Sequence, residues 1–102
     1  MSNGNSKETI KEKIIEHLLK RNVEFWNEVY IGIAQDPHKR LFEEHNVKEK
    51  GGIWIYIKAN SSECAREVEK ELITLGANGG PGGGSDETIY VYAYKITNET
   101  VQ

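Results

Sequence analysis

Three short runs of the chain alternate aliphatic with aromatic or polar residues, and this alternation limits the folds open to it. The runs are VYIGIA at 29–34, GIWIYIKA at 52–59 and TIYVYAYKI at 88–96. Strict alternation is the period of a β-strand that shows a different kind of side chain to each face of a sheet. The sequence therefore predicts a sheet with one aliphatic face, which packs on helices, and one face rich in tyrosine and tryptophan.

Three further stretches, 6–22, 36–46 and 60–76, carry the signals of helices. Each begins with a residue whose side chain caps helix N-termini: Ser6, Asp36 and Asn60. Together with the strands they predict an α+β fold, in which a three-stranded sheet, expected to be antiparallel, carries three helices in the order α-β-α-β-α-β. We expect one domain over 6–102, preceded by a disordered tail at 1–5.

The charge and composition of the chain exclude several classes of protein. The 102 residues carry a net charge of −3, so no general basic field attracts nucleic acid, and any such binding must rest on a local patch. A single cysteine, Cys64, excludes an internal disulfide and a cysteine-cluster metal site. No apolar run of spanning length and no leader-like segment is present, so we expect a cytoplasmic protein without a membrane partner.

Glu69 is the most informative single residue of the third predicted helix. On a helical wheel Ala65, Val68, Leu72 and Leu75 form the buried stripe, and Glu69 falls inside its arc. An ionised carboxylate costs several kcal/mol to bury unless it is paired or binds a cation. Glu69 is therefore either a structural ion-pair partner at the edge of the core or a metal ligand or acid–base residue.

Gly32 and Arg40 each allow two interpretations. Glycine weakens a strand interior, so Gly32 marks the close approach either of a ligand or of a packed neighbour in the fold. Arg40 precedes Glu44 by four residues, and an exposed ion pair along the helix accounts for it from spacing alone. His45 is interpreted as a satisfied histidine on a helix face, since spacing fixes no metal site around it.

The glycine-rich segment at 76–85 is not a phosphate-binding P-loop. Such a loop lies between a strand and a helix and ends in Gly-Lys-Ser/Thr, whereas this segment lies between a helix and a strand and no lysine follows it. We expect a flexible connector or a mobile lid.

The stretch VYIGIAQDPHKRL resembles the second half of the GIY-YIG endonuclease signature. It contains Tyr30, Ile31 and Gly32, with Arg40 ten residues after the tyrosine. The later run WIYIKANSSECAREVEKELI is similar to the third strand of that family and the helix after it, which places the family's metal-binding glutamate at Glu69. The family match and the wheel argument select the same residue.

The resemblance departs from the family at the first strand. The family begins with a Gly-Ile-Tyr strand just upstream of Tyr-Ile-Gly, whereas this chain has a charged helix there. The candidate replacement lies near the other end of the sequence, with Thr88-Ile89-Tyr90 in place of Gly-Ile-Tyr. We therefore predict a circular permutation that puts the last strand beside the Tyr30 strand; the alternative is a coincidence of tyrosine-rich composition. The histidine that often follows the family's arginine by four residues is displaced by one, to His45.

The resemblance implies hydrolysis of a DNA phosphodiester with one Mg²⁺ or Mn²⁺ ion. Glu69 would ligate the metal, Arg40 would bind the scissile phosphate, and Tyr30, Tyr90 or both would position the attacking water. The nucleic-acid-binding residues expected around this site are Gly32, Lys39, Trp54, Tyr56 and Tyr92.

A second interpretation belongs to a different class of protein. The chain would keep this scaffold as a non-catalytic binding or protein-interaction module, with a protein partner in place of DNA. The placement of Tyr90 relative to Tyr30 and Glu69 discriminates between the two interpretations.

Overall fold

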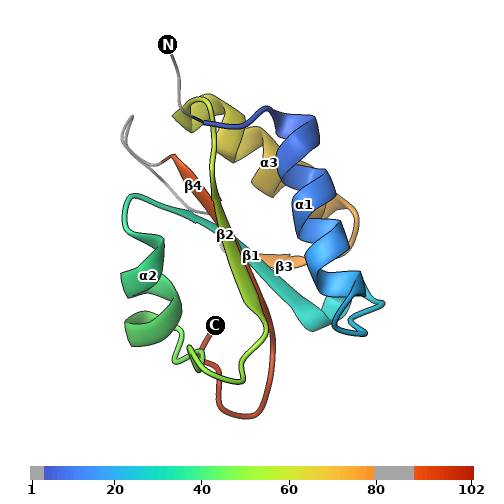
Figure 1. The fold of residues 1–102 in the computed structure, drawn as a ribbon, viewed down its shortest axis with the longest axis vertical. Coiled ribbons are helices and arrows are strands. Elements are labelled where there is room, and N and C mark those ends of the chain that lie inside the picture. Colours follow the sequence, from blue (N-terminus) through green and yellow to red (C-terminus); the bar gives the residue numbers. More distant parts are fainter. Residues whose placement is uncertain (1–3, 80–88) are drawn as a thin grey trace.

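A computed structural model gives the structure, which describes residues 4–79 and 89–102. Helix α1 (Lys7–Leu19) begins where the Ser6 hydroxyl accepts a hydrogen bond from the Thr9 amide. Ser61 is the N-cap of helix α3 (Ser62–Thr74), one residue after the predicted cap, and Leu75 is its C-cap. The two helices pack side by side (Figure 1). Their inward faces bury the residues expected from the helical spacing: Ile10, Ile14 and Leu18 on α1, and Ala65, Val68 and Leu72 on α3.

The sheet has four strands in the order β2-β4-β1-β3. The strands are β1 (Val29–Ala34), β2 (Trp54–Lys58), β3 (Asn78–Gly79) and β4 (Tyr90–Lys95). Strand β4 runs antiparallel to both of its neighbours, whereas β3 runs parallel to β1. The expected three-stranded antiparallel sheet and the expected order α-β-α-β-α-β are therefore wrong, because β3 lies between α3 and β4. The α+β class and the three helices are confirmed.

The additional strand β3 follows directly after the end of α3. It contains only two residues, which is too short for any alternation to appear in the sequence, and it falls at the start of the predicted glycine-rich connector. Pairing with β1 stabilises it, and the Asn78 side chain also donates to the backbone oxygen of Asn27 at 2.9 Å. Residues 80–88, the remainder of that connector and the start of the proposed permuted strand, lie outside the described residues.

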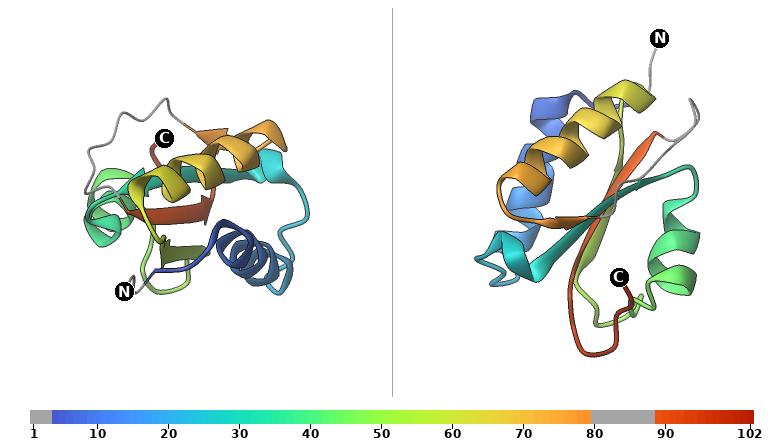
Figure 2. Two further views of the ribbon diagram at one scale, coloured as in Figure 1. Left: turned by 90° about the horizontal axis from the view of Figure 1, so that it is seen from above. Right: turned by 180° about the vertical axis from the view of Figure 1, so that it is seen from behind.

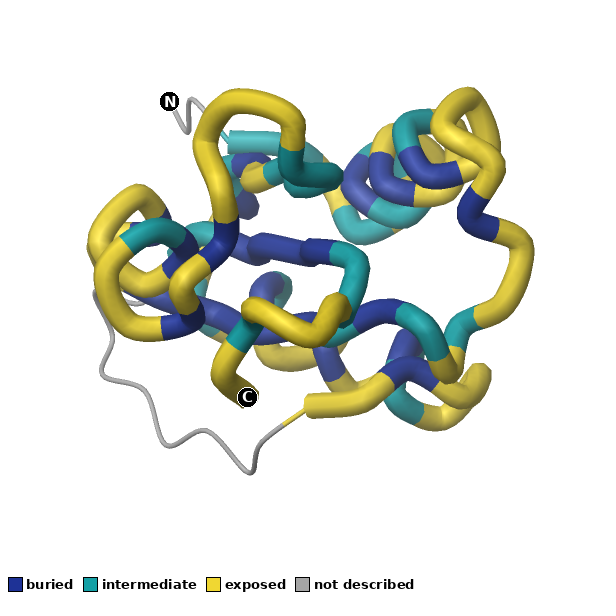
Figure 3. Tube along the Cα trace, turned by 90° about the horizontal axis from the view of Figure 1, so that it is seen from below, coloured by how far each residue is buried: buried dark blue, intermediate teal, exposed yellow. Residues whose placement is uncertain are grey.

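Helices cover both faces of the sheet, as Figure 2 shows from two sides. Helices α1 and α3 lie on the aliphatic face, where Ile31, Ile33 and Val91 join the main core. On the aromatic face, α2 (Pro37–Lys39) continues into a π-helical segment, η2 (Arg40–Glu44). Figure 3 shows that buried positions concentrate in the strands and on the inward sides of the helices. The aromatic face is thus partly covered, by a single short element.

Segments near the two ends of the chain join this framework through backbone hydrogen bonds. A short 3₁₀ turn, η1 (Trp26–Glu28), leads into β1. Within the predicted tail, Asn5 forms an isolated bridge with Ala59, while residues 1–3 lie outside the described residues. Near the C-terminus, the Val101 amide donates to the His45 carbonyl at 2.8 Å, which holds the last residues against the end of η2.

None of the helices in the described part of the chain is both long enough and apolar enough to cross a membrane.

Candidate functional site

The pairing of β1 with β4 decides which tyrosines meet. Tyr30 lies opposite Tyr94, and Gly32 lies opposite Tyr92. The Tyr30 ring centroid is 5.3 Å from that of Tyr94 and 6.5 Å from that of Tyr92. Tyr90 pairs instead with Ala34, four residues farther along β1 from Tyr30. The structure therefore puts the last strand beside the Tyr30 strand, but the tyrosine that it brings to Tyr30 is Tyr94 rather than Tyr90.

The close approach that Gly32 permits is made by a side chain of the protein itself. A methyl group at this position would overlap the ring carbon Cζ and the hydroxyl of Tyr92. Tyr92 is buried, with its hydroxyl over Gly32 and its ring unavailable to an external base. The packing interpretation of Gly32 accounts for the residue, and Tyr92 fills the place at which a ligand was expected.

His45 connects this tyrosine cluster to the C-terminus. Its side chain is only 7% exposed. Ring nitrogen Nδ1 lies 2.7 Å from the Val101 carbonyl oxygen, and Nε2 lies 2.7 Å from the Tyr92 hydroxyl. Because a carbonyl oxygen can only accept, Nδ1 is the nitrogen that carries the proton when the ring is neutral, and Nε2 then accepts from the Tyr92 hydroxyl. The Tyr94 hydroxyl lies 3.1 Å from Nδ1. His45 is thus satisfied at both nitrogens.

Burial keeps two of the three clustered phenols protonated. It raises the pKa of both the Tyr92 and the Tyr94 hydroxyls well above the usual value for tyrosine, and the neighbouring Tyr30 adds to the effect. Tyr30 is the partly exposed member of the cluster, and its ring packs 4.9 Å from the His45 ring. Among these three, Tyr30 is therefore the phenol that a solvent molecule can reach.

Glu69 is buried, as the helical wheel predicts, and only 9% of it is exposed. Burial raises the pKa of its carboxyl group to about 7, and the nearby Arg66 charge opposes this only in part. No ion pair or hydrogen bond joins the Glu69 carboxyl to another of the described residues. The structural ion pair that would explain its burial is therefore not found within residues 4–79 and 89–102.

Arg40 and Glu69 approach Tyr92 from different elements. The Arg40 charge lowers the pKa of the Tyr92 hydroxyl and the Glu69 charge raises it, both as smaller effects beside burial. Arg40 is exposed, and its Nη1 pairs with Glu44 Oε1 at 3.3 Å, as the four-residue spacing predicts. The charges of Arg40 and Glu69 therefore both act on Tyr92, Arg40 from η2 on the aromatic face and Glu69 from α3 on the aliphatic face.

The described residues contain no group of three or more histidine, cysteine, aspartate or glutamate side chains that could hold a metal ion. Glu69 is a single carboxylate, with no second carboxylate, histidine or cysteine grouped around it among the described residues in a set of three. Mg²⁺ is commonly held by one or two carboxylates together with water and substrate phosphate oxygens. A buried carboxyl group that forms no ion pair or hydrogen bond with the described residues fits that limited role, and it does not fit a dedicated structural metal site.

The remaining nucleic-acid-binding candidates lie on the aromatic face. Trp54 and Tyr56 project from β2 on the same face as Tyr90 and Tyr92, and Tyr56 is 39% exposed. Lys39 is exposed at the end of α2 and lines a shallow pocket with Asp36, Arg40 and Glu44.

The sequence did not indicate Tyr94 as a site residue, because the alternation places it on the aromatic face without showing which residue of β1 it pairs with.

Comparison of the chain with protein-family models, with curated proteins and with solved structures finds no match. The case for a function therefore rests on the residues and the geometry described above.

Proposed function

We propose that this protein is a small metal-dependent nuclease of GIY-YIG type, which hydrolyses a DNA phosphodiester at the site formed by Tyr30, Arg40 and Glu69. One observation carries the proposal: Glu69 is buried without a partner among the described residues, and its charge reaches the same tyrosine as that of Arg40. A carboxyl group kept in such surroundings is typical of a functional residue.

The position of the last strand supports the idea of a permuted GIY-YIG arrangement. Strand β4 lies antiparallel beside β1, where the missing first strand of the family would pair. The tyrosine that pairs with Tyr30 is Tyr94. The tyrosine that would correspond to that of the family's Gly-Ile-Tyr strand therefore lies four residues after Tyr90, the position predicted from the sequence. In this proposal Tyr94 is a buried support for Tyr30, and Tyr90 has no part in the chemistry.

His45 follows Arg40 by five residues, one more than the spacing of the family, and the helical turn between these two residues is irregular. The His45 amide donates to the Arg40 carbonyl at 2.8 Å, a bond between residues five apart that belongs to a π-turn. A π-turn holds one more residue than an α-turn, so His45 follows Arg40 after one turn despite the additional residue. Single π-turns inside helices are frequent at functional sites.

Each side chain of the proposed site has a distinct role. Glu69 would hold Mg²⁺ or Mn²⁺, which stabilises the charge on phosphorus and on the leaving oxygen. Arg40 would exchange its exposed pair with Glu44 for the scissile phosphate, to which a planar guanidinium donates two hydrogen bonds. Tyr30, the accessible phenol, would orient the attacking water. Tyr92 and Tyr94 remain protonated and fix the position of Tyr30.

The test combines metal binding with cleavage. End-labelled single-stranded and duplex DNA are incubated with Mg²⁺ or Mn²⁺ and the wild-type protein, Arg40→Gln or Glu69→Gln. Glu67→Gln, which changes an exposed carboxylate on the same helix, is the matched control. We expect cleavage by the wild type and the control, and a loss of at least about 100-fold in rate for the other two variants, because each removes charge stabilisation at the phosphate.

Backbone amide broadening by Mn²⁺ measures metal binding without any substrate. Broadening centred on Glu69, Tyr30 and Gly32, and absent in Glu69→Gln, is the expected result. Diffuse broadening along the acidic surface that the substitution leaves unchanged, together with no cleavage, would refute the nuclease.

Three observations favour the second candidate, a non-catalytic binding module on the same scaffold. Tyr90, whose placement discriminates between the two candidates, pairs with Ala34 and not with Tyr30. The described residues supply a single metal ligand, and Arg40 already has a carboxylate partner in Glu44. A protein that binds nucleic acid or another protein without cleaving DNA, and whose binding is insensitive to Glu69→Gln, would identify the chain as such a module.

A further inference from the structure

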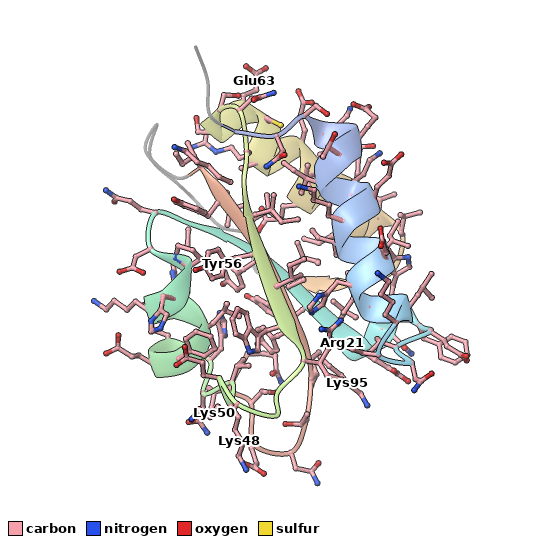
Figure 4. The ribbon with its side chains drawn as sticks, viewed as in Figure 1. Arg21, Lys48, Lys50, Tyr56, Glu63 and Lys95 are labelled. Carbon is pink, nitrogen blue, oxygen red and sulfur yellow. The ribbon has the colours of Figure 1, made fainter. Side chains whose placement is uncertain are left out.

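The aromatic face of the sheet has a part that no helix covers within residues 4–79 and 89–102. Segments α2 and η2 pack over the portion that contains Tyr92 and Tyr94, through Leu41 and Phe42. Tyr56 and Tyr90 lie farther toward the other end of their strands, and neither belongs to that buried cluster. In Figure 4 the Tyr56 side chain lies in the space between β2 and α2. An aromatic surface thus remains in contact with solvent beside the proposed site.

Tyr56 and Tyr90 form the uncovered part of this surface, and Trp54 lies at its border, where the Phe42 ring of η2 packs edge-on against it at 4.9 Å. We call these three rings the aromatic platform. The Trp54 and Tyr56 rings are 6.0 Å apart between centroids and nearly parallel, at 10°. The Tyr90 ring meets Tyr56 edge-on at 6.0 Å. The Trp54 indole donates to the Glu49 carbonyl at 3.0 Å, which fixes the orientation of its ring. The platform is therefore ordered by contacts within the protein.

Cationic side chains flank the platform on both sides. Lys58 on β2 pairs with Tyr90 on β4, and Tyr90 pairs on its other side with Ala34 on β1. Ala34 lines the pocket that contains Lys39 and Arg40. Neighbouring strands are about 4.8 Å apart, so this row spans roughly 10 Å from Lys58 to Ala34. Within the described part of the chain, neither lysine side chain forms an ion pair. Glu44 pairs with Arg40, and Asp36 caps the Lys39 amide.

We infer that the aromatic platform binds unpaired nucleobases, and that the substrate of the proposed nuclease is single-stranded nucleic acid, with its phosphates at Lys58 and at Lys39 and Arg40. This inference rests on the proposed function. Base faces are accessible for stacking on aromatic side chains only when the strand is unpaired. The two flanking groups of cations match the phosphates on either side of a stacked base.

The net charge of the protein favours single-stranded nucleic acid over duplex DNA as its ligand. Proteins that hold duplex DNA commonly neutralise several phosphates with lysine and arginine. This chain has a net charge of −3, and it offers only a few cations around the platform. Stacking is less sensitive to net charge than phosphate contacts are, so single-stranded binding through the platform is compatible with an acidic protein.

Fluorescence anisotropy of a labelled oligothymidylate tests the inference directly, with Glu69→Gln as the background to prevent cleavage. We expect saturable binding to the single strand, at least about tenfold weaker binding to a duplex, and at least about tenfold weaker binding of the single strand by Tyr56→Ala, because one stacking contact is lost. Lys58→Gln should lower the slope of log affinity against log salt by about one. Phe25→Ala is the matched control, since Phe25 is an exposed aromatic residue (63%) outside the platform.

The results separate this inference from the proposed function. Platform-dependent binding of single strands by a protein that cleaves nothing would support the platform and refute the nuclease. Cleavage of duplex DNA with no measurable affinity for single strands would support the nuclease and overturn the platform. Equal effects of Tyr56→Ala and Phe25→Ala, or no binding by any of these proteins, would also overturn it.

Discussion

Replacing Glu69 with glutamine should make the protein more stable at neutral and alkaline pH. The Glu69 carboxyl group loses its proton at about pH 4.5 in an unfolded chain, whereas burial raises the pKa to about 7 in the folded protein. At Glu69 the folded state therefore binds more protons than the unfolded state between these values, so the contribution of this residue to wild-type stability falls as the pH rises from about 4.5 to about 7. Glutamine has no proton to lose and does not carry this dependence.

The magnitude follows from the size of the shift. A difference of about 2.5 pKa units corresponds to about 3 kcal/mol in the free energy of unfolding, at 1.36 kcal/mol per unit. We expect Glu69→Gln and the wild type to be equally stable near pH 4.5 and to differ by about 2 to 3 kcal/mol at pH 8, with the variant more stable. For a domain of this size, that difference raises the melting temperature by roughly 10 °C.

Urea unfolding followed by tryptophan fluorescence at pH 4.5, 6 and 8 in the presence of a chelator measures the effect. Glu67→Gln on the exposed face of α3 is the control, and it should follow the wild-type profile. Adding Mg²⁺ at pH 8 should stabilise the wild type and leave Glu69→Gln unchanged, because only the ionised carboxylate binds the ion; a concentration of 100 times the dissociation constant is worth about 2.7 kcal/mol.

Two results would refute this reasoning. If Glu69→Gln were less stable than the wild type at pH 8, the carboxylate would have a stabilising partner in the folded protein. If the difference between the two proteins did not change from pH 4.5 to pH 8, the carboxyl group would have the same pKa in the folded and unfolded states. Either outcome would remove the physical basis for treating Glu69 as a functional residue.

Further predictions concern the contacts around the site and one helix cap. Deleting Val101 and Gln102 removes the two hydrogen bonds between Val101 and His45, so the free energy of unfolding measured in urea should fall by about 2 kcal/mol. In the same variant, ¹⁵N NMR of the imidazole should show the proton leaving Nδ1. An unchanged ring spectrum would contradict the tautomer assigned to His45. Gly32→Ala places a methyl group against Tyr92 and should cost about 1 to 3 kcal/mol, measured by thermal unfolding, and a neutral effect would show that the Tyr92 ring can move aside. Ser61→Ala removes the side-chain cap of α3 and should cost about 1 kcal/mol, whereas Ser62→Ala should change stability by less than about 0.5 kcal/mol; equal effects would assign the cap wrongly.

The sequence alone predicted which residues share a face, because the periods of helices and strands determine this locally. Alternation put Tyr30, Tyr92 and Tyr94 on one face of the sheet, and the helical wheel put Glu69 in the buried stripe of α3; the structure has both arrangements. The His45 ring has a hydrogen-bond partner at each nitrogen, which agrees with its interpretation as a satisfied histidine on a helix face. Each of these inferences used residues within one element.

Strand pairing could not be predicted in the same way. A shift of two or four residues along β4 leaves every side chain on its original face, so the alternation cannot distinguish Tyr90 from Tyr94 as the neighbour of Tyr30. The two-residue strand β3 presents a related difficulty, since its pairing with β1 depends on where α3 ends rather than on its own sequence. Contacts distant in sequence decide both features.

The region around His45 shows how a local irregularity can preserve a long-range contact. With regular α-helical winding after Arg40, a residue four positions later would complete the turn, and His45 would lie about 100° beyond that position. The π-turn absorbs the additional residue, and His45 then reaches Tyr92 on β4 and Val101 at the C-terminus together. A π-turn is uncommon because its backbone geometry is unfavourable, so the buried hydrogen bonds of His45 must offset that cost. The winding of η2 is therefore a consequence of the contacts that His45 makes, and no propensity of the RLFEE segment itself would have predicted it.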